Sequence, residues 1–258
     1  MILHRSTWPE VEAYLRRSRG VVIPTGSTEQ HGPHGLIGTD SITAESIAHA
    51  FAQTSSVLIG PTVTLSQAQF NLGFPGTVSL RPTTLIAVMV DYIESLACQG
   101  FTHFYLLNGH GGNVAPAMCA FQELYAQRGV AGRRLPPIRC RLRSWWDFES
   151  VNRLRSVWYG SGEGMHATPS EIAITRHVLP GCLPQDGLAP AAPLPPAFLR
   201  LHAADNHPDS ALHRAQFPDG RVGSHSALGT AEQGKALVAA AAEAMLADYQ
   251  DFLTEPLA

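Results

Sequence analysis

Residues 20–40 read GVVIPTGSTEQHGPHGLIGTD, an apolar run followed by a loop rich in potential metal ligands. The apolar run at residues 20–23 predicts a short buried strand, and the glycines and prolines after it predict a folded-back loop. Four possible ligands occupy this loop: Glu29, His31, His34 and Asp40. Because open α/β sheets bind ligands beyond the carboxyl ends of their strands, we expect this loop to carry the chemistry of the protein.

The ligand types in the loop favour a transition metal. Glu29 and His31 are two positions apart, so an extended chain directs both side chains to the same side. Imidazole combined with carboxylate suits a divalent transition metal better than calcium or magnesium, which prefer oxygen ligands. A glycine-rich surface loop would explain a lone histidine. The whole cluster behind an apolar strand instead favours a metal site, which would need further ligands from elsewhere in the chain.

Apolar runs and helical periodicities alternate along the rest of the 258-residue chain. Further apolar runs predict strands at residues 57–61, 101–108 and 137–143. Periodic apolar positions predict helices at residues 6–19, 40–53, 81–99, 114–128, 169–178 and 230–252. Continuous apolar strands alternating with helices are typical of a parallel sheet covered on both faces. We therefore predict one α/β domain over residues 1–258, with a surface excursion in the Pro- and Ala-rich stretch at 180–208.

The composition argues against several classes of protein. A formal net charge of -3 gives no general attraction for nucleic acid. Lys235 is the only lysine, which makes a Schiff base hard to build, and no GxxxxGK[ST] phosphate loop occurs. The four cysteines are widely spaced without a CxxC pair, which argues against a zinc ribbon. The sequence shows neither a signal segment nor an apolar run of about 20 residues, so we expect a cytoplasmic protein that does not enter a membrane.

Two further features lie outside the ligand loops. Eight arginines fall between Arg128 and Arg155, where we expect a solvated or interface surface rather than a phosphate-binding patch, because acidic residues interrupt them. Trp145, Trp146 and Trp158 could cover the site as a lid, but packing in the interior is the better explanation.

Two later segments are expected to complete the site. The segment NGHGGN at residues 108–113 follows a predicted strand and opens a helix, so His110 should project at the same sheet edge as the first loop. A glycine-rich turn can also bind phosphate through its amides, but a central histidine favours a metal ligand. His166 lies in the loop before the helix at residues 169–178. Glu171 lies in the first turn of that helix, where the helix dipole also favours a carboxylate.

Five of these side chains are sufficient to bind two divalent ions: Glu29, His31, Asp40, His110 and Glu171. One carboxylate, most economically Asp40, would bridge the two ions, which can activate a shared water near neutral pH and polarise a carbonyl. This chemistry suits hydrolysis of an unactivated C–N bond. The leaving nitrogen needs a proton, and His166 is the candidate that delivers it.

These motifs resemble those of the creatininase family, the creatinine amidohydrolase-like proteins. The resemblance covers the first loop, residues 74–80 (FPGTVSL), the NGHGGN segment, residues 166–171 and residues 220–234 (GRVGSHSALGTAEQG). It implies a three-layer α/β/α fold with a mostly parallel central sheet and a binuclear centre of zinc, manganese or iron, with zinc expected first. It also implies hydrolysis of an amide or formamide in a small molecule and a homo-oligomeric assembly, often a hexamer in the family.

Carried over by position, the resemblance implies one ion held by Glu29, Asp40 and His110, and a second held by His31, Asp40 and Glu171. His166 then handles protons, and we assign His166 and Glu171 to catalysis.

The chain also departs from the family pattern. Creatininases proper carry a Tyr-Glu pair after the histidine of the second motif, and that glutamate is a ligand. Gly111 and Gly112 take these places here, so the ligand role passes to Glu171. Residues 69–71 and 223–226 also differ, and they shape the substrate pocket more than the metal ligands. A cyclic amide, a formamide and a precursor peptide of the mycofactocin type therefore remain open as substrates. A non-catalytic ligand-binding descendant is the alternative from another class.

Overall fold

A four-stranded parallel sheet forms the centre of the computed structural model, which describes residues 1–129, 136–183, 189–191, 194 and 209–257. The strands are β1 (Gly20–Thr25), β2 (Leu58–Ile59), β3 (His103–Asn108) and β4 (Arg139–Ser144), in the spatial order β2-β1-β3-β4. In the register, Val22 lies opposite Ile59 on one side and Tyr105 on the other. The predicted parallel sheet is confirmed.

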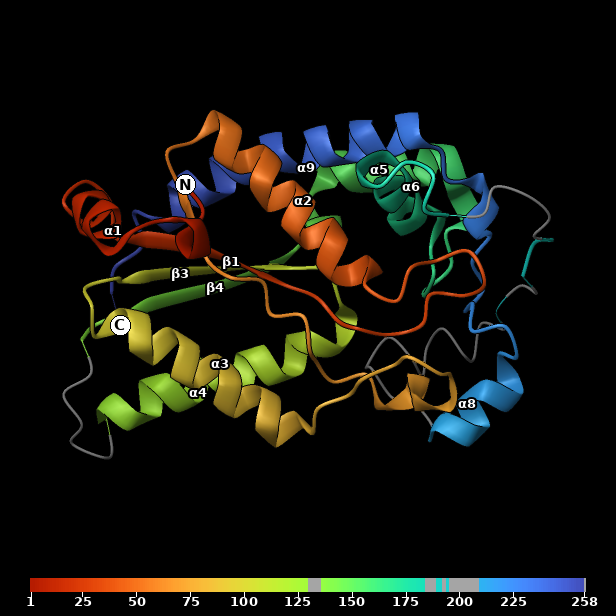
Figure 1. The fold of residues 1–258 in the computed structure, drawn as a ribbon, viewed down its shortest axis with the longest axis horizontal. Coiled ribbons are helices and arrows are strands. Elements are labelled where there is room, and N and C mark those ends of the chain that lie inside the picture. The colour runs from red at the N-terminus through yellow and green to blue at the C-terminus, as the bar shows by residue number, and fades with distance from the viewer. Residues whose placement is uncertain (130–135, 184–188, 192–193, 195–208, 258) are drawn as a thin grey trace.

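Helices cover both faces of this sheet (Figure 1). One face carries α2 (Thr39–Thr54), α5 (Glu149–Tyr159), α6 (Pro169–Val178) and α9 (Ala231–Phe252). The opposite face carries α3 (Pro82–Ala97) and α4 (Val114–Gly129), and α1 (Trp8–Leu15) contributes Tyr14 to the same apolar cluster. The three-layer α/β/α architecture is therefore confirmed.

Alternation along the strands explains the two cores. In a strand, successive side chains point to opposite faces. Val22 and Tyr105 accordingly lie in the cluster formed with α2 and α9, whereas Val21, Ile23 and Phe104 lie in the cluster formed with α3 and α4. Both faces of β1 are buried, which is why its sequence reads as a continuous apolar run.

The main differences from the predicted elements lie in polar segments. Helix α5 was not predicted, because charged residues dilute its buried positions Val151 and Tyr159. Helix α8 (Ser210–Gln216) was also not predicted. Short 3-10 helices add η1 (Leu3–Arg5), η2 (Gln69–Gly73), η3 (Gly111–Asn113), η4 (Trp145–Asp147), η5 (Gly160–Gly162) and η6 (Ser226–Leu228). The excursion predicted at 180–208 falls largely outside the described residues. In the part of the chain that is described, no helix combines the length and apolar character needed to cross a membrane.

Candidate metal centre

The first loop leaves β1 and folds back against the start of α2. The Gly26 amide donates to the Val63 carbonyl at 2.8 Å, and the Glu29 amide donates to the Ile37 carbonyl at 2.8 Å. These bonds close the loop around the Glu29 side chain, which is completely buried. The loop therefore holds one carboxylate in a fixed interior position beside the sheet edge.

Asp40 comes from the first turn of α2. It lies two residues after the N-cap of the helix, which is Gly38. The amino end of a helix stabilises a nearby negative charge, so this position suits a carboxylate. The side chain is 2 % exposed and points into the centre.

The second loop is held by two asparagines. Asn108 accepts a hydrogen bond from the His110 amide at 3.1 Å and donates to the His110 carbonyl at 2.8 Å. Asn113 donates to Asn108 Oδ1 at 3.1 Å and to the Gly26 carbonyl of the first loop at 2.9 Å. These contacts join the two loops and fix the backbone that carries His110.

Gly109 lies where the second loop approaches α2. A Cβ atom at this position would stand 2.2 Å from the Asp40 carbonyl oxygen, much closer than van der Waals contact. Gly109→Ala should therefore lower the free energy of unfolding by about 1–3 kcal/mol, the usual cost of overpacking. Urea denaturation measures this loss. Gly38→Ala, at the N-cap of α2, is the control, because its Cβ would meet no atom closer than 3.7 Å. Equal losses in both variants would contradict the close approach as the cause.

The third segment brings His166 and Glu171 to the same place. His166 forms an antiparallel bridge with Val222, and Ser224 Oγ donates to the His166 carbonyl at 2.6 Å. The next residue, Ala167, has a φ of 57°, a left-handed conformation that is uncommon outside glycine. Residues 220–226 therefore brace the turn that presents His166.

Glu171 is fixed by the N-terminal cap of α6. Its Oε2 accepts hydrogen bonds from the Thr168 amide at 2.8 Å and from Thr168 Oγ1 at 2.9 Å. This is a capping box, in which the cap and the third helical residue satisfy each other. The second carboxylate oxygen of Glu171 takes no part in the box.

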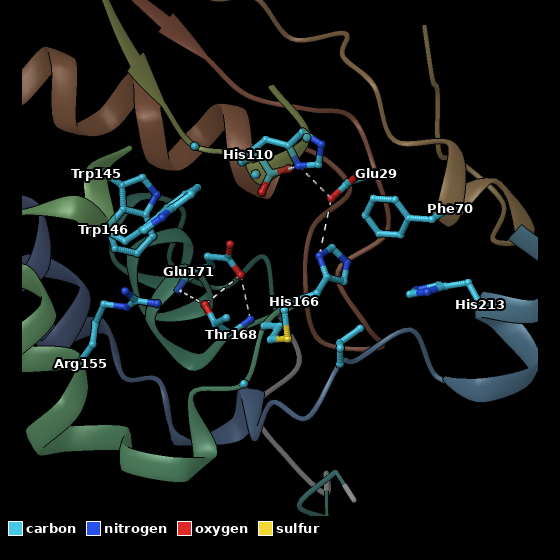
Figure 2. A pocket seen from close by; sticks show the side chains of 17 residues that line it. Glu29, Phe70, His110, Trp145, Trp146, Arg155, His166, Thr168, Glu171 and His213 are labelled. Carbon is cyan, nitrogen blue, oxygen red and sulfur yellow. Dashed lines mark hydrogen bonds and ion pairs between the residues drawn. The ribbon is translucent and has the colours of Figure 1, made fainter. Parts of the chain in front are cut away.

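The five expected ligands and His166 converge. Figure 2 labels four of these six side chains around the pocket: Glu29, His110, His166 and Glu171. His110 Nδ1 lies 3.2 Å from Glu29 Oε1 and 3.1 Å from Asp40 Oδ2. His31 Nε2 lies 2.9 Å from the other Asp40 oxygen, Oδ1. His166 Nδ1 lies 3.6 Å from Glu29 Oε1. Side chains from three separated segments thus share one small volume at the carboxyl ends of β1 and β3.

Each imidazole is oriented by a main-chain carbonyl. His31 Nδ1 lies 3.1 Å from the Glu29 carbonyl, His110 Nε2 lies 2.9 Å from the Gln67 carbonyl, and His166 Nε2 lies 2.6 Å from the Gln30 carbonyl. A carbonyl oxygen only accepts, so each of these nitrogens carries a hydrogen. For His31 and His110, the nitrogen that faces the carboxylates must then be protonated or bound to a cation.

The side chains fit two divalent ions. Three groups place their ligand atoms within 4.8 Å of one another: Glu29, Asp40 and His110; His31, Asp40 and Glu171; and Glu29, His31 and His166. Asp40 belongs to the first two groups, one oxygen facing His110 and the other facing His31. Both oxygens of Glu29 and Asp40 Oδ2 are buried and make no well-aligned hydrogen bond among the described residues, although His110 Nδ1 lies near Glu29 Oε1 and Asp40 Oδ2. Buried carboxylate oxygens need a partner, and a cation supplies it.

The electrostatics of the centre point the same way. Burial raises the pKa of Asp40, but the His31 and His110 imidazoles together outweigh burial and hold the pKa well below its usual range. Burial lowers the pKa of His31, but Asp40 raises it to about 10. His110 has its pKa raised well above the usual value by Glu29 and Asp40, against burial. The negative charge of the buried carboxylates must therefore be compensated. Protons on these imidazoles or divalent ions can provide the positive charge.

The pKa values of His166 and Glu171 shift in the directions that favour their neutral forms. Burial, together with the charge on His31, lowers the pKa of His166 to about 4. Burial raises the pKa of Glu171 to about 7, against the opposing effect of His31. His166 is thus the imidazole of this cluster that stays neutral at neutral pH.

A pocket of about 320 Å³ opens onto the centre. Glu29, Asp40, His110, His166 and Glu171 form its acidic and imidazole wall. The remaining wall is largely aromatic and apolar, with Phe70, Trp145, Trp146, Met165, His213 and Val222, and it also contains Arg155. The volume is at the lower end of the range for small-molecule sites.

Several site residues differ from expectation. His34 is buried but belongs to none of the described ligand groups. Trp145 both packs in the core and lines the pocket, and Trp146 lines it as well. Trp158 packs beside the core and does not line the pocket. Arg155, expected on a solvated surface, is a pocket residue.

Comparison with known proteins gives a consistent result. The sequence model of the creatininase family, described as creatinine amidohydrolase, matches residues 4–248. The chain is 28% identical over 209 residues to the mycofactocin precursor peptide peptidase of Mycobacterium ulcerans (strain Agy99), covering 76% of this chain and 70% of that protein. It is 30% identical over 148 residues to the creatinine amidohydrolase of Pseudomonas putida, covering 55% of this chain and 56% of that protein.

Solved creatininases share the fold. A crystal structure of creatinine amidohydrolase (creatininase) superimposes with a TM-score of 0.82 and 21% identity, over 99% of this chain and 98% of that chain. A creatininase mutant of Zn-Zn type, with a TM-score of 0.79, matches at 21% identity over 98% of each chain. A manganese creatininase, with a TM-score of 0.80, matches at 21% identity over 98% of this chain and 99% of that chain. Since the family match extends along nearly the whole sequence, the chain belongs to the creatininase family.

Proposed function

We propose that this chain is a hydrolase that uses two divalent ions to cleave a C–N bond of a small amide, cyclic amide or formamide. The ions would be held by the five converging ligands: Glu29, His31, Asp40, His110 and Glu171. The observation that carries the proposal is the sharing of Asp40 between two ligand groups, with one oxygen turned to each. Imidazole and carboxylate ligands suit zinc first, with manganese or iron as alternatives.

The chain's own residues supply the geometry of the reaction. When bound, the two ions would polarise the scissile carbonyl and activate the attacking water. The carbonyls of Gln67 and Glu29 orient His110 and His31, a support that commonly fixes the ligating nitrogen of a histidine. The Thr168 cap holds Oε2 of Glu171, so its other oxygen remains for the centre.

His166 is the proposed proton carrier. Its Nε2 donates to the Gln30 carbonyl, so Nδ1 is the nitrogen that accepts a proton from the attacking water. Nδ1 lies 3.6 Å from Glu29 Oε1, at the edge of the ligand cluster. The lowered pKa keeps this imidazole neutral at pH 7, and the proton taken from water can then pass to the leaving nitrogen.

A peptide bond is the second candidate target. Of the two relatives described above, the one with the longer match is named a mycofactocin precursor peptide peptidase and covers 76% of this chain. This similarity favours a peptide segment as the substrate. The pocket of about 320 Å³ favours a small molecule or the end of a chain. We further propose a homo-oligomer, as the family resemblance implies, in the cytoplasm.

Removal of the metal tests the proposal. Protein purified from zinc-supplemented cells should contain about two ions per chain and hydrolyse members of a panel of creatinine, formamides and short peptides. Dialysis against EDTA should abolish both metal content and turnover, and added zinc or manganese should restore both together. Full activity without detectable metal would refute the proposal, and a chain that never binds metal would favour the non-catalytic ligand-binding alternative.

A further inference from the structure

Arg155 lies in the pocket wall, apart from the proposed ligands and proton carrier. It comes from α5, and Figure 2 shows its side chain reaching toward the pocket on the side opposite Phe70 and His213. Met165 and Val222 also line the pocket and add apolar surface to it. The pocket thus combines the proposed ion centre with a guanidinium in one of its walls.

Two hydrogen bonds hold the guanidinium in place, and some of its N–H donors remain without a partner among the described residues. Arg155 Nε donates to Glu163 Oε1 at 2.9 Å, and Nη1 donates to Asn152 Oδ1 at 2.7 Å. Its Cζ lies 5.6 Å from the centroid of the Trp145 ring, which supports the cation from one side. Nη2 has no hydrogen-bond partner among the described residues, although the side chain is only 18 % exposed. Three of its five N–H donors, two on Nη2 and one on Nη1, therefore remain for a ligand in the pocket.

The charge balance of the pocket favours an anion. Three pocket carboxylates, those of Glu29, Asp40 and Glu171, would be outweighed by the four positive charges of two divalent ions. The Arg155–Glu163 pair is neutral, so one positive charge remains while the attacking water is undissociated. A buried site with excess positive charge attracts an anionic substrate and rejects a cationic one.

We propose that Arg155 binds a carboxylate of the substrate while the scissile carbonyl lies at the ion centre. The inference rests on the proposed function, and it names the substrate class as amides that carry a carboxylate near the scissile bond. N-acyl amino acids and the carboxyl-terminal ends of peptides belong to this class. A planar guanidinium recognises a carboxylate through paired hydrogen bonds, which a neutral carboxamide cannot reproduce.

Matched acid and amide probes test this assignment. Three compounds would be used, each beside its own C-terminal carboxamide: N-formylphenylalanine, N-acetylphenylalanine and alanylphenylalanine. For the two-ion protein we expect a kcat/KM about 10- to 100-fold higher for the acid than for its carboxamide, in the range of a hydrogen bond to a charged group. Arg155→Gln should erase this preference and keep the metal content. Arg153→Gln, at an exposed arginine of the same helix, should keep the preference.

The design separates failure of this inference from failure of the hydrolase proposal. Equal or faster hydrolysis of the carboxamides by the wild-type protein would overturn the role of Arg155 and leave the hydrolase intact. If no probe is hydrolysed, calorimetric binding of the same pairs decides. Tighter binding of the acids than of the carboxamides, lost in Arg155→Gln, supports the inference even when no probe is hydrolysed. Equal binding of acid and carboxamide, or no binding of either, overturns it. Urea denaturation of Arg155→Gln checks that loss of the Glu163 contact has not unfolded the pocket.

Discussion

Replacing Asp40 with alanine is expected to remove both divalent ions, whereas His31→Ala and His110→Ala should each remove about one. The difference follows from Asp40, whose two oxygens face His31 and His110 separately and which belongs to two of the described ligand groups. Elemental analysis of the purified variants, after expression with added zinc, gives the number of ions per chain. Turnover should fall with either single loss if both ions act together.

Glu45→Ala is the matched control for Asp40→Ala. Glu45 also lies on α2, but it accepts a hydrogen bond from Thr62 and is 38% exposed, outside the described ligand groups. It should retain both ions. Thermal unfolding adds a second readout, because a ligand at 100 times its dissociation constant stabilises the folded state by about 2.7 kcal/mol. Asp40→Ala should lose this metal-dependent stabilisation completely, and a variant that still bound one ion tightly would contradict the shared carboxylate.

The convergence of Glu29, Asp40 and His110 could be predicted because it follows from topology. β1 and β3 are parallel neighbours in register from Gly20 and His103 to Thr25 and Asn108, so the loops that follow them leave the sheet side by side. Continuous apolar runs identified both strands as buried, and the polar residues after each run marked the same edge. Beyond the order of strands and helices along the chain, no further information was needed to predict this convergence.

The supporting contacts of the site could not be predicted in the same way. The carbonyls of Gln67 and Gln30 orient two of the imidazoles, and every residue has a carbonyl, so the sequence carries no signal for them. Asn108 and Asn113 did carry a signal, since asparagine beside glycine favours tight turns, but their partners depend on the tertiary fold. Arg155 was missed because α5 was not among the predicted elements, and its place in the pocket wall depends on the tertiary fold.

Replacing His166 with alanine should leave the ions in place and lower kcat by about 10²- to 10⁴-fold, the usual contribution of a positioned acid or base. His166 is absent from the two ligand groups that share Asp40, so its loss removes no proposed ligand. Its Nδ1 nevertheless faces Glu29 Oε1 at 3.6 Å, close enough to exchange a proton with a group bound at the centre. Steady-state kinetics and elemental analysis on the same preparation measure both effects.

His49→Ala supplies the control, because this histidine lies on α2 away from the pocket and its side chain is 31% exposed. It should keep both the ions and the turnover. The third described group, Glu29 with His31 and His166, offers the competing arrangement, in which His166 is a ligand. Loss of an ion in His166→Ala would establish that arrangement and contradict the proton role. Loss of turnover with two ions retained at unchanged affinity supports the proton role, because removal of a ligand would weaken metal binding.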